Sequence, residues 1–162
     1  MVTGVKANHL YEIDEAAAGE VLEAGVPVRR PHFSDVSDLL RHTHHEEAFD
    51  DFALQPTLSK RMSQLGPGVS WFDVDADGWD DLIIGSGRGG HLAVFRNDGL
   101  GGFVRLEGLP FAQAITRDQT TVLGWRKPGG GTVLLAGSAN YEDGLTNGSV
   151  VRQFDFGWSS SG

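Results

Sequence analysis

Residues 69–85 read VSWFDVDADGWDDLIIG, and they give the clearest indication of how the chain folds. Its acidic middle, residues 73–81, lies between two short segments, VSWF and LIIG, that are rich in strand-forming residues. Aspartates stand at positions 1, 3, 5 and 9 of the middle, and the glycine at position 6 permits a sharp turn. The pattern therefore predicts a strand, a tight acidic loop and a second strand.

The spacing of these aspartates brings several oxygen atoms to one point, and Ca²⁺ prefers six to eight oxygen ligands. Two carboxylates about 4 Å apart repel by about 1 kcal/mol in water and by about 4 kcal/mol at an effective dielectric constant of about 20. We therefore expect a calcium site, and a solvated acidic turn is the alternative. The expected ligands are the side chains of Asp73, Asp75, Asp77 and Asp81, the backbone carbonyl of Trp79, and water.

This loop differs from an EF-hand, which needs a bidentate Glu at position 12. Here position 12 is Ile84, inside an apolar segment. The flanking segments also have the composition of strands rather than of helices. Asp81 is consequently the ligand expected to close the shell, and Asp80 is expected to point away from it.

Short apolar segments separated by turn-forming clusters continue from the loop toward the C-terminus. They are HLAVF (91–95), TVLGW (121–125), TVLLAGS (132–138) and SVVRQFDF (149–156). Their spacing predicts an antiparallel meander. Leu82–Ser86 also aligns with Leu134–Ser138, 52 residues later, which indicates an internal repeat. The second copy has RKPGGG at 126–131 in place of DVDADG, so no calcium site is expected there.

WFDVDADGWDDLIIG (71–85) and LAVFRNDG (92–99) resemble FG-GAP/VCBS repeats, the blades of integrin-α-like β-propellers. The stretch 42–78 is also similar to the ASPIC/UnbV and cartilage-acidic-protein group. In the FG-GAP/VCBS family the DxDxDGxxD loop joins two strands of a blade and binds Ca²⁺. The resemblance implies that Asp73, Asp75, Asp77 and Asp81 are side-chain ligands and that Trp79 is a carbonyl ligand.

We therefore expect an all-β fold, a partial β-propeller of about two to three blades, behind a partly helical N-terminal leader. The leader spans 1–65, with mixed helix and extended chain, and short helices are expected over 13–24, from Ser34 to Leu40, and over 58–66. The blades span 66–162, with the calcium-binding repeat at 66–108 and a degenerate repeat at 118–158. Neighbouring blades of a longer parent chain are expected partners, because propellers typically need at least about four blades.

Composition limits the partners and the compartment. The chain has a net charge of -9, which disfavours nonspecific binding to nucleic acid. It has no cysteine and therefore no disulfide or thiolate metal site. No apolar run approaches the roughly 18 residues of a membrane span, and no signal peptide begins the chain. We expect a part of a longer exported protein that is extracellular, periplasmic or on the cell surface.

The expected function is noncatalytic: adhesion, or binding of a protein or carbohydrate ligand. No nucleophile–base pair emerges from the sequence, so no catalytic residue is predicted. An accessory module of a larger secreted carbohydrate-active or hydrolytic enzyme is the alternative. A nucleotide enzyme based on GSGRGG (85–90) is disfavoured, because the stretch that follows is too short for a crossover helix. The cluster His42, His44 and His45 is either a transition-metal site or a polar segment on the propeller edge.

Overall fold

A computed structural model of the protein describes residues 32–148 and 150–156. The chain divides into two compact units, Met1–Asp35 and Val36–Gly162, and the following description concerns the second. That unit begins with two short helices, α1 (Ser37–Leu40) and α2 (Asp51–Leu54). No helix in the described part of the chain is long and apolar enough to cross a membrane.

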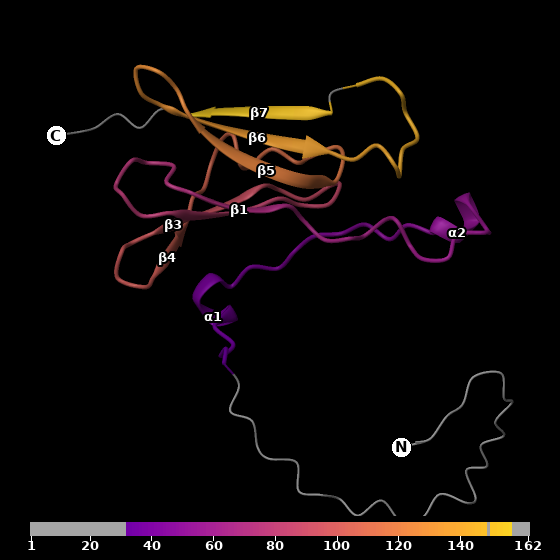
Figure 1. The fold of residues 1–162 in the computed structure, drawn as a ribbon, viewed down its shortest axis with the longest axis horizontal. Helices are drawn as coiled ribbons and strands as arrows, with labels where there is room; N and C mark the ends of the chain where they lie inside the picture. Colours follow the sequence, from indigo (N-terminus) through magenta and orange to yellow (C-terminus); the bar gives the residue numbers. More distant parts are fainter. Residues whose placement is uncertain (1–31, 149, 157–162) are drawn as a thin grey trace, which may run out of the picture. The chain divides into compact units, whose positions relative to one another are not determined.

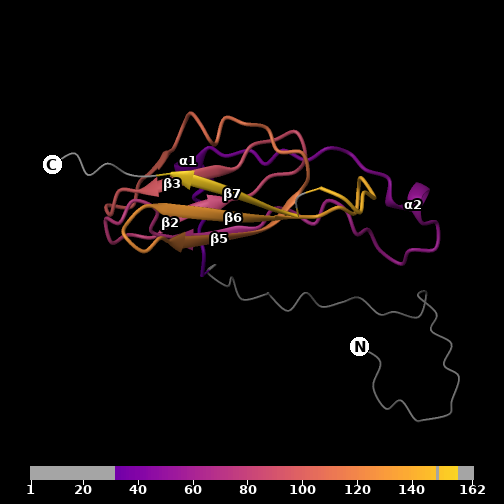
Figure 2. The same cartoon turned by 90° about the horizontal axis from the view of Figure 1, so that it is seen from above.

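The strands form two antiparallel sheets (Figure 1 and, from above, Figure 2). The bounds of the first sheet's strands, in spatial order, are β1 (Val69–Phe72), β2 (Asp81–Ile84), β3 (Ala93–Asn97) and β4 (Phe103–Arg105). Those of the second are β5 (Gln119–Arg126), β6 (Thr132–Ser138) and β7 (Val151–Phe156). Within each sheet, every strand pairs with the next along the chain, as the predicted meander requires. The all-β class is therefore confirmed.

The two segments that the repeat aligned occupy the same place in the two sheets. Leu82–Ser86 contains most of β2, and Leu134–Ser138 ends β6, so both lie in the second strand of their sheet. The sequence analysis did not predict β4. That strand has three residues, FVR, and follows a glycine-rich turn.

The inner faces of the two sheets share one hydrophobic core. Ile83 and Val94 belong to the first sheet, and Leu134 and Phe154 to the second, and each is almost fully buried in the same cluster. Strands β1 and β5 are also in contact. Residues of alternating sequence position therefore face the core, as expected for strands with one face buried.

The opposite face of the first sheet has a smaller core of its own. Leu82, Ile84, Ala93 and Phe95 are buried there, and Leu40 of α1 packs against them. The imidazole ring of His42 also meets the Phe95 ring edge-on, with 5.6 Å between centroids. The segment that includes α1 thus covers part of this face.

Two of the expected helices differ from the structure. The expected helix from Ser34 begins only at Ser37, and no side chain caps it. The expected helical turns over 58–66 are wrong. The buried carboxylate of Asp51 instead accepts hydrogen bonds from the backbone N–H of Met62, at 2.6 Å, and of Ser63, at 2.9 Å. These bonds hold the segment in a nonhelical conformation. The expected helix over 13–24 lies outside the described residues.

A glycine of β5 allows the two sheets to approach closely, and we predict that Gly124→Ala destabilises the fold. A Cβ at Gly124 would lie 2.1 Å from the Phe72 ring of β1. We expect a loss of about 1–3 kcal/mol in the free energy of unfolding, measured by urea denaturation, because overpacking forces side chains and backbone to shift. Gly137→Ala on β6 is the matched control, because its Cβ would meet Thr121 at an ordinary 3.5 Å. Equal effects of the two variants would contradict the steric account.

Candidate metal site

The acidic loop joins β1 to β2 and ends at Asp81, the first residue of β2. The side chain of Asp81 is fully buried. One of its oxygens accepts from the backbone N–H of Val74 at 2.7 Å, and the other accepts from that of Asn97 at 2.8 Å. A buried carboxylate is costly unless it is hydrogen-bonded, and these two bonds meet that requirement. Asp81 therefore ties the loop to the end of β3.

Asp73 organises the first half of the loop. Its carboxylate accepts from the backbone N–H of Ala76 at 2.6 Å and of Gly78 at 3.1 Å, and more weakly from that of Asp77 at 3.2 Å. The chain turns sharply here, since Ala76 has a φ of 66° and Gly78 a φ of 94°. Gly78 was predicted to permit this turn, and the structure confirms it.

Three of the four predicted aspartates come together. Each of Asp73, Asp75 and Asp81 offers one carboxylate oxygen, and these oxygens all lie within 4.8 Å of one another. Burial, followed by the negative charge of Asp77, raises the pKa of Asp75 above its usual value. Burial also raises the pKa of Asp81. In both cases burial is the first cause, and the negative charges of neighbouring aspartates in the loop add to it.

The other two predicted ligands lie at the exposed side of the loop. The carboxylate of Asp77 accepts from the backbone N–H of Trp79 at 2.8 Å and is not one of the three that converge. The Trp79 side chain is half-exposed, and its indole lies against Gly99 in the turn after β3. Asp77 and the Trp79 carbonyl therefore remain predicted ligands.

Two side chains of the second sheet donate hydrogen bonds to the backbone of the acidic loop. The Arg126 guanidinium donates to the backbone carbonyl of Asp73 at 2.5 Å, and one of its nitrogens lies 3.7 Å from the Asp73 carboxylate. The Thr132 hydroxyl donates to the carbonyl of Val74 at 2.5 Å. The sequence analysis missed both residues, because the only signal for them was that the degenerate repeat places them where the first repeat has its acidic loop.

The described part of the chain does not bring the three histidines before α2 together as a group of metal ligands. The segment that carries them is neither helix nor strand. The imidazole of His42 packs on Phe95, whereas that of His44 hydrogen-bonds to Glu46 at 2.9 Å. No group of converging metal ligands within the described ranges includes His45 or either of the others. These contacts agree with the alternative, a polar segment that packs against a sheet.

A second carboxylate group forms from residues far apart in sequence, Glu46, Asp118 and Glu142, whose oxygens also lie within 4.8 Å of one another. Burial raises the pKa of Glu142 to about 7, with a further contribution from the charges of Asp118 and Glu46. Near neutral pH Glu142 is therefore protonated in a large share of molecules, which removes one of the three charges. Sequence reasoning could not find this group, because only the fold brings its members together.

We predict that Glu142 makes the protein less stable as the pH rises. In the folded state its pKa is about 7, above the 4.5 of an ordinary Glu, so the folded state binds this proton more tightly than the unfolded chain does. The free energy of unfolding should then fall from about pH 4.5 to about pH 7, and Glu142→Gln should reduce that fall. Urea denaturation at about pH 5 and about pH 8 measures it. Glu107→Gln, at an exposed Glu, is the control, and an identical pH dependence in both variants would contradict the assignment.

Comparison with protein-family models, with curated proteins and with solved structures finds no match to this chain.

Proposed function

We propose that this chain is a calcium-stabilised β-propeller segment that acts as a noncatalytic binding or adhesion module outside the cytoplasm. One observation carries the proposal. The carboxylate oxygens of Asp73, Asp75 and Asp81 lie within 4.8 Å of one another, in the loop between the first two strands of an antiparallel sheet. These are three of the positions that the repeat pattern assigns to the cation.

The chemistry of these ligands suits Ca²⁺. All the converging atoms are carboxylate oxygens, the hard ligands that Ca²⁺ and Mg²⁺ prefer, and no imidazole joins them within the described residues. The Arg96 guanidinium approaches Asp75 only to 3.9 Å, and that of Arg126 approaches Asp73 only to 3.7 Å. In the proposal Asp77, the Trp79 carbonyl and water complete the shell, and the ion fixes the loop in place.

The arrangement of the sheets supports the propeller. Two consecutive antiparallel sheets stack face to face, as neighbouring blades do. Large apolar side chains remain exposed on both outer faces: Val69 and Trp71 on the first sheet, and Leu123 and Trp125 on the second, each more than half exposed. Further blades would cover these surfaces, which agrees with a segment of a longer ring.

We predict that Ca²⁺ raises the melting temperature of chelator-treated protein. With a dissociation constant of about 10⁻⁴–10⁻³ M, about 1 mM Ca²⁺ stabilises the folded state by about 0.4–1.4 kcal/mol. That free energy corresponds to a shift of about 1–5 °C for a chain of this size. Thermal melts followed by circular dichroism, with and without Ca²⁺, measure the shift.

Two variants of the same loop make this test specific. Asp75→Asn should abolish most of the shift, because it removes a converging carboxylate that makes only one hydrogen bond in the loop, at 3.3 Å. Asp80→Asn should leave the shift intact, because Asp80 is exposed and does not belong to the converging group. Loss of the shift in both variants, or in neither, would refute the proposed ligand set.

A further inference from the structure

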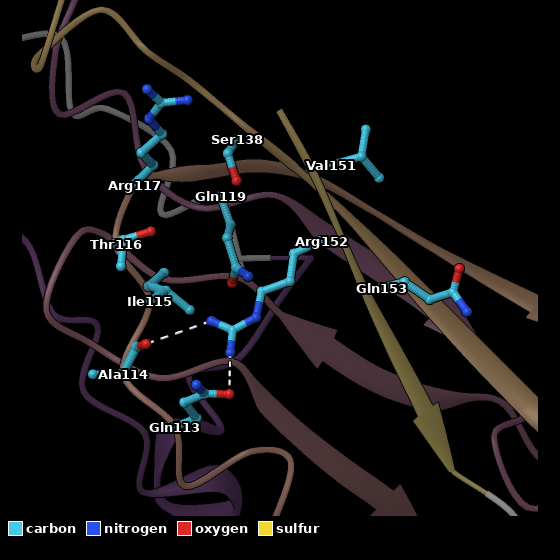
Figure 3. A pocket seen from close by; sticks show the side chains of 10 residues that line it. All are labelled: Gln113, Ala114, Ile115, Thr116, Arg117, Gln119, Ser138, Val151, Arg152 and Gln153. Carbon is cyan, nitrogen blue, oxygen red and sulfur yellow. Dashed lines mark hydrogen bonds between the residues drawn. The ribbon is translucent and has the colours of Figure 1, made fainter. Parts of the chain in front are cut away.

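A polar pocket of about 400 Å³ lies where the second sheet meets the loop before it. Residues 113–117 form one wall, and the ends of β5, β6 and β7 contribute Gln119, Ser138 and Arg152 (Figure 3). None of the predicted calcium ligands lines this pocket. It is therefore a second candidate site, built from other segments of the chain.

The side chain of Gln119 gives the strongest indication that this pocket is a binding site. It is 1% exposed, and neither the oxygen nor the nitrogen of its carboxamide has a hydrogen-bond partner in the described chain. Its backbone N–H donates to the carbonyl of Ser86, shortly after β2, and its carbonyl accepts from the N–H of Gly68, just before β1, each at 2.9 Å. Figure 3 shows the carboxamide directed toward the Arg152 side of the pocket. A buried amide without partners is rare and unfavourable, so this group needs both a donor and an acceptor.

Arg152 brings an uncompensated positive charge to the same pocket. Its guanidinium donates to the side-chain oxygen of Gln113 and, at 3.4 Å, to the carbonyl of Ala114, and it lies 5.0 Å above the Phe154 ring. All three partners are neutral. The other arginine of the pocket, Arg117, already pairs with Asp143 at 2.5 Å. No Asp or Glu lines the pocket, although the chain as a whole has a net charge of -9.

We propose that this pocket binds a small hydroxycarboxylate of the size of a sugar acid. The ligand carboxylate pairs with Arg152, because a guanidinium binds carboxylates through parallel hydrogen bonds. A ligand hydroxyl donates to the Gln119 oxygen and accepts from its nitrogen. The Ser138 hydroxyl lies in the same lining and contributes a further donor and acceptor.

Other ligand chemistries fit less well. A neutral sugar leaves the charge of Arg152 unpaired, and a simple carboxylate without a hydroxyl has no donor for the Gln119 oxygen. The volume of about 400 Å³ falls within the range of small-molecule sites and exceeds what one carboxylate group fills. The carboxamide is buried, so side chains around it must move aside when the ligand enters, and in the proposal the Arg152 guanidinium turns from Gln113 and Ala114 to the ligand. The inference rests on the binding function proposed above and names a class of ligand for it. It does not depend on the calcium site.

The test is calorimetric titration of the whole chain with D-glucuronate at about 0.15 M salt, an ionic strength that screens weak surface charge. We expect saturable binding at one site per chain, at least about tenfold tighter than for D-glucose or propionate. The glucuronate titration is repeated in the presence of Ca²⁺ and in the presence of a chelator, and a thermal melt is recorded in each condition. The comparison separates this site from the acidic loop. Binding in both conditions supports the pocket even where the calcium site fails. No binding to folded protein by about 10 mM glucuronate, or equal binding of glucose, would overturn the proposal.

Three variants test whether glucuronate binds in this pocket. Arg152→Gln should weaken glucuronate binding by at least about tenfold. Arg105→Gln is the matched control, because Arg105 also lies over a Phe ring, that of Phe95, but outside the pocket. Gln119→Leu should abolish binding without lowering the melting temperature, since it removes an unpaired buried amide. Binding that survives in both Arg152→Gln and Gln119→Leu would refute the assignment to this pocket.

Discussion

The acidic hairpin depends on one buried carboxylate, that of Asp81. Its side chain has no exposed surface, and its two oxygens accept from backbone N–H groups at 2.7 and 2.8 Å, one in the loop and one at the end of β3. An ionised group in this position must keep such partners, because an unpaired buried charge is strongly unfavourable. Each oxygen retains a further lone pair, and one of the oxygens lies within 4.8 Å of oxygens from Asp73 and Asp75. The same residue thus connects the acidic loop to the end of β3 and provides the buried carboxylate of the candidate cation site.

The hairpin is also joined to the second sheet, so a cation in the loop would act on more than the loop. The Arg126 guanidinium donates to the backbone carbonyl of Asp73 at 2.5 Å, and the Thr132 hydroxyl donates to that of Val74 at 2.5 Å. Val74 itself is fully buried in the core that the two sheets share. Ordering of the acidic loop would therefore stabilise the packing between the sheets, which is the role expected of a structural ion.

Local signals in the sequence predicted most of the fold and the centre of the site. Strand-forming residues between turn clusters predicted six of the strands, and the spacing of the aspartates predicted four converging carboxylates, of which three converge in the structure. The signals failed where distant contacts decide the structure. Residues 58–66 have helix-forming composition, but Asp51 binds their backbone, and β4 has only three residues with no clear alternation. The Glu46, Asp118 and Glu142 group and the unpaired amide of Gln119 arise only when separate segments meet, so no sequence pattern marks them.

The central claim is that the acidic loop holds a cation on carboxylate oxygens beside Trp79, and luminescence of Tb³⁺ tests it most directly. This ion takes oxygen ligands as Ca²⁺ does, and a nearby indole transfers excitation energy to it. We expect terbium emission on excitation of tryptophan, displacement of that emission by Ca²⁺, and loss of most of it in Trp79→Phe with binding retained. An absence of sensitised emission from folded protein, or emission that Ca²⁺ does not displace, would contradict the account.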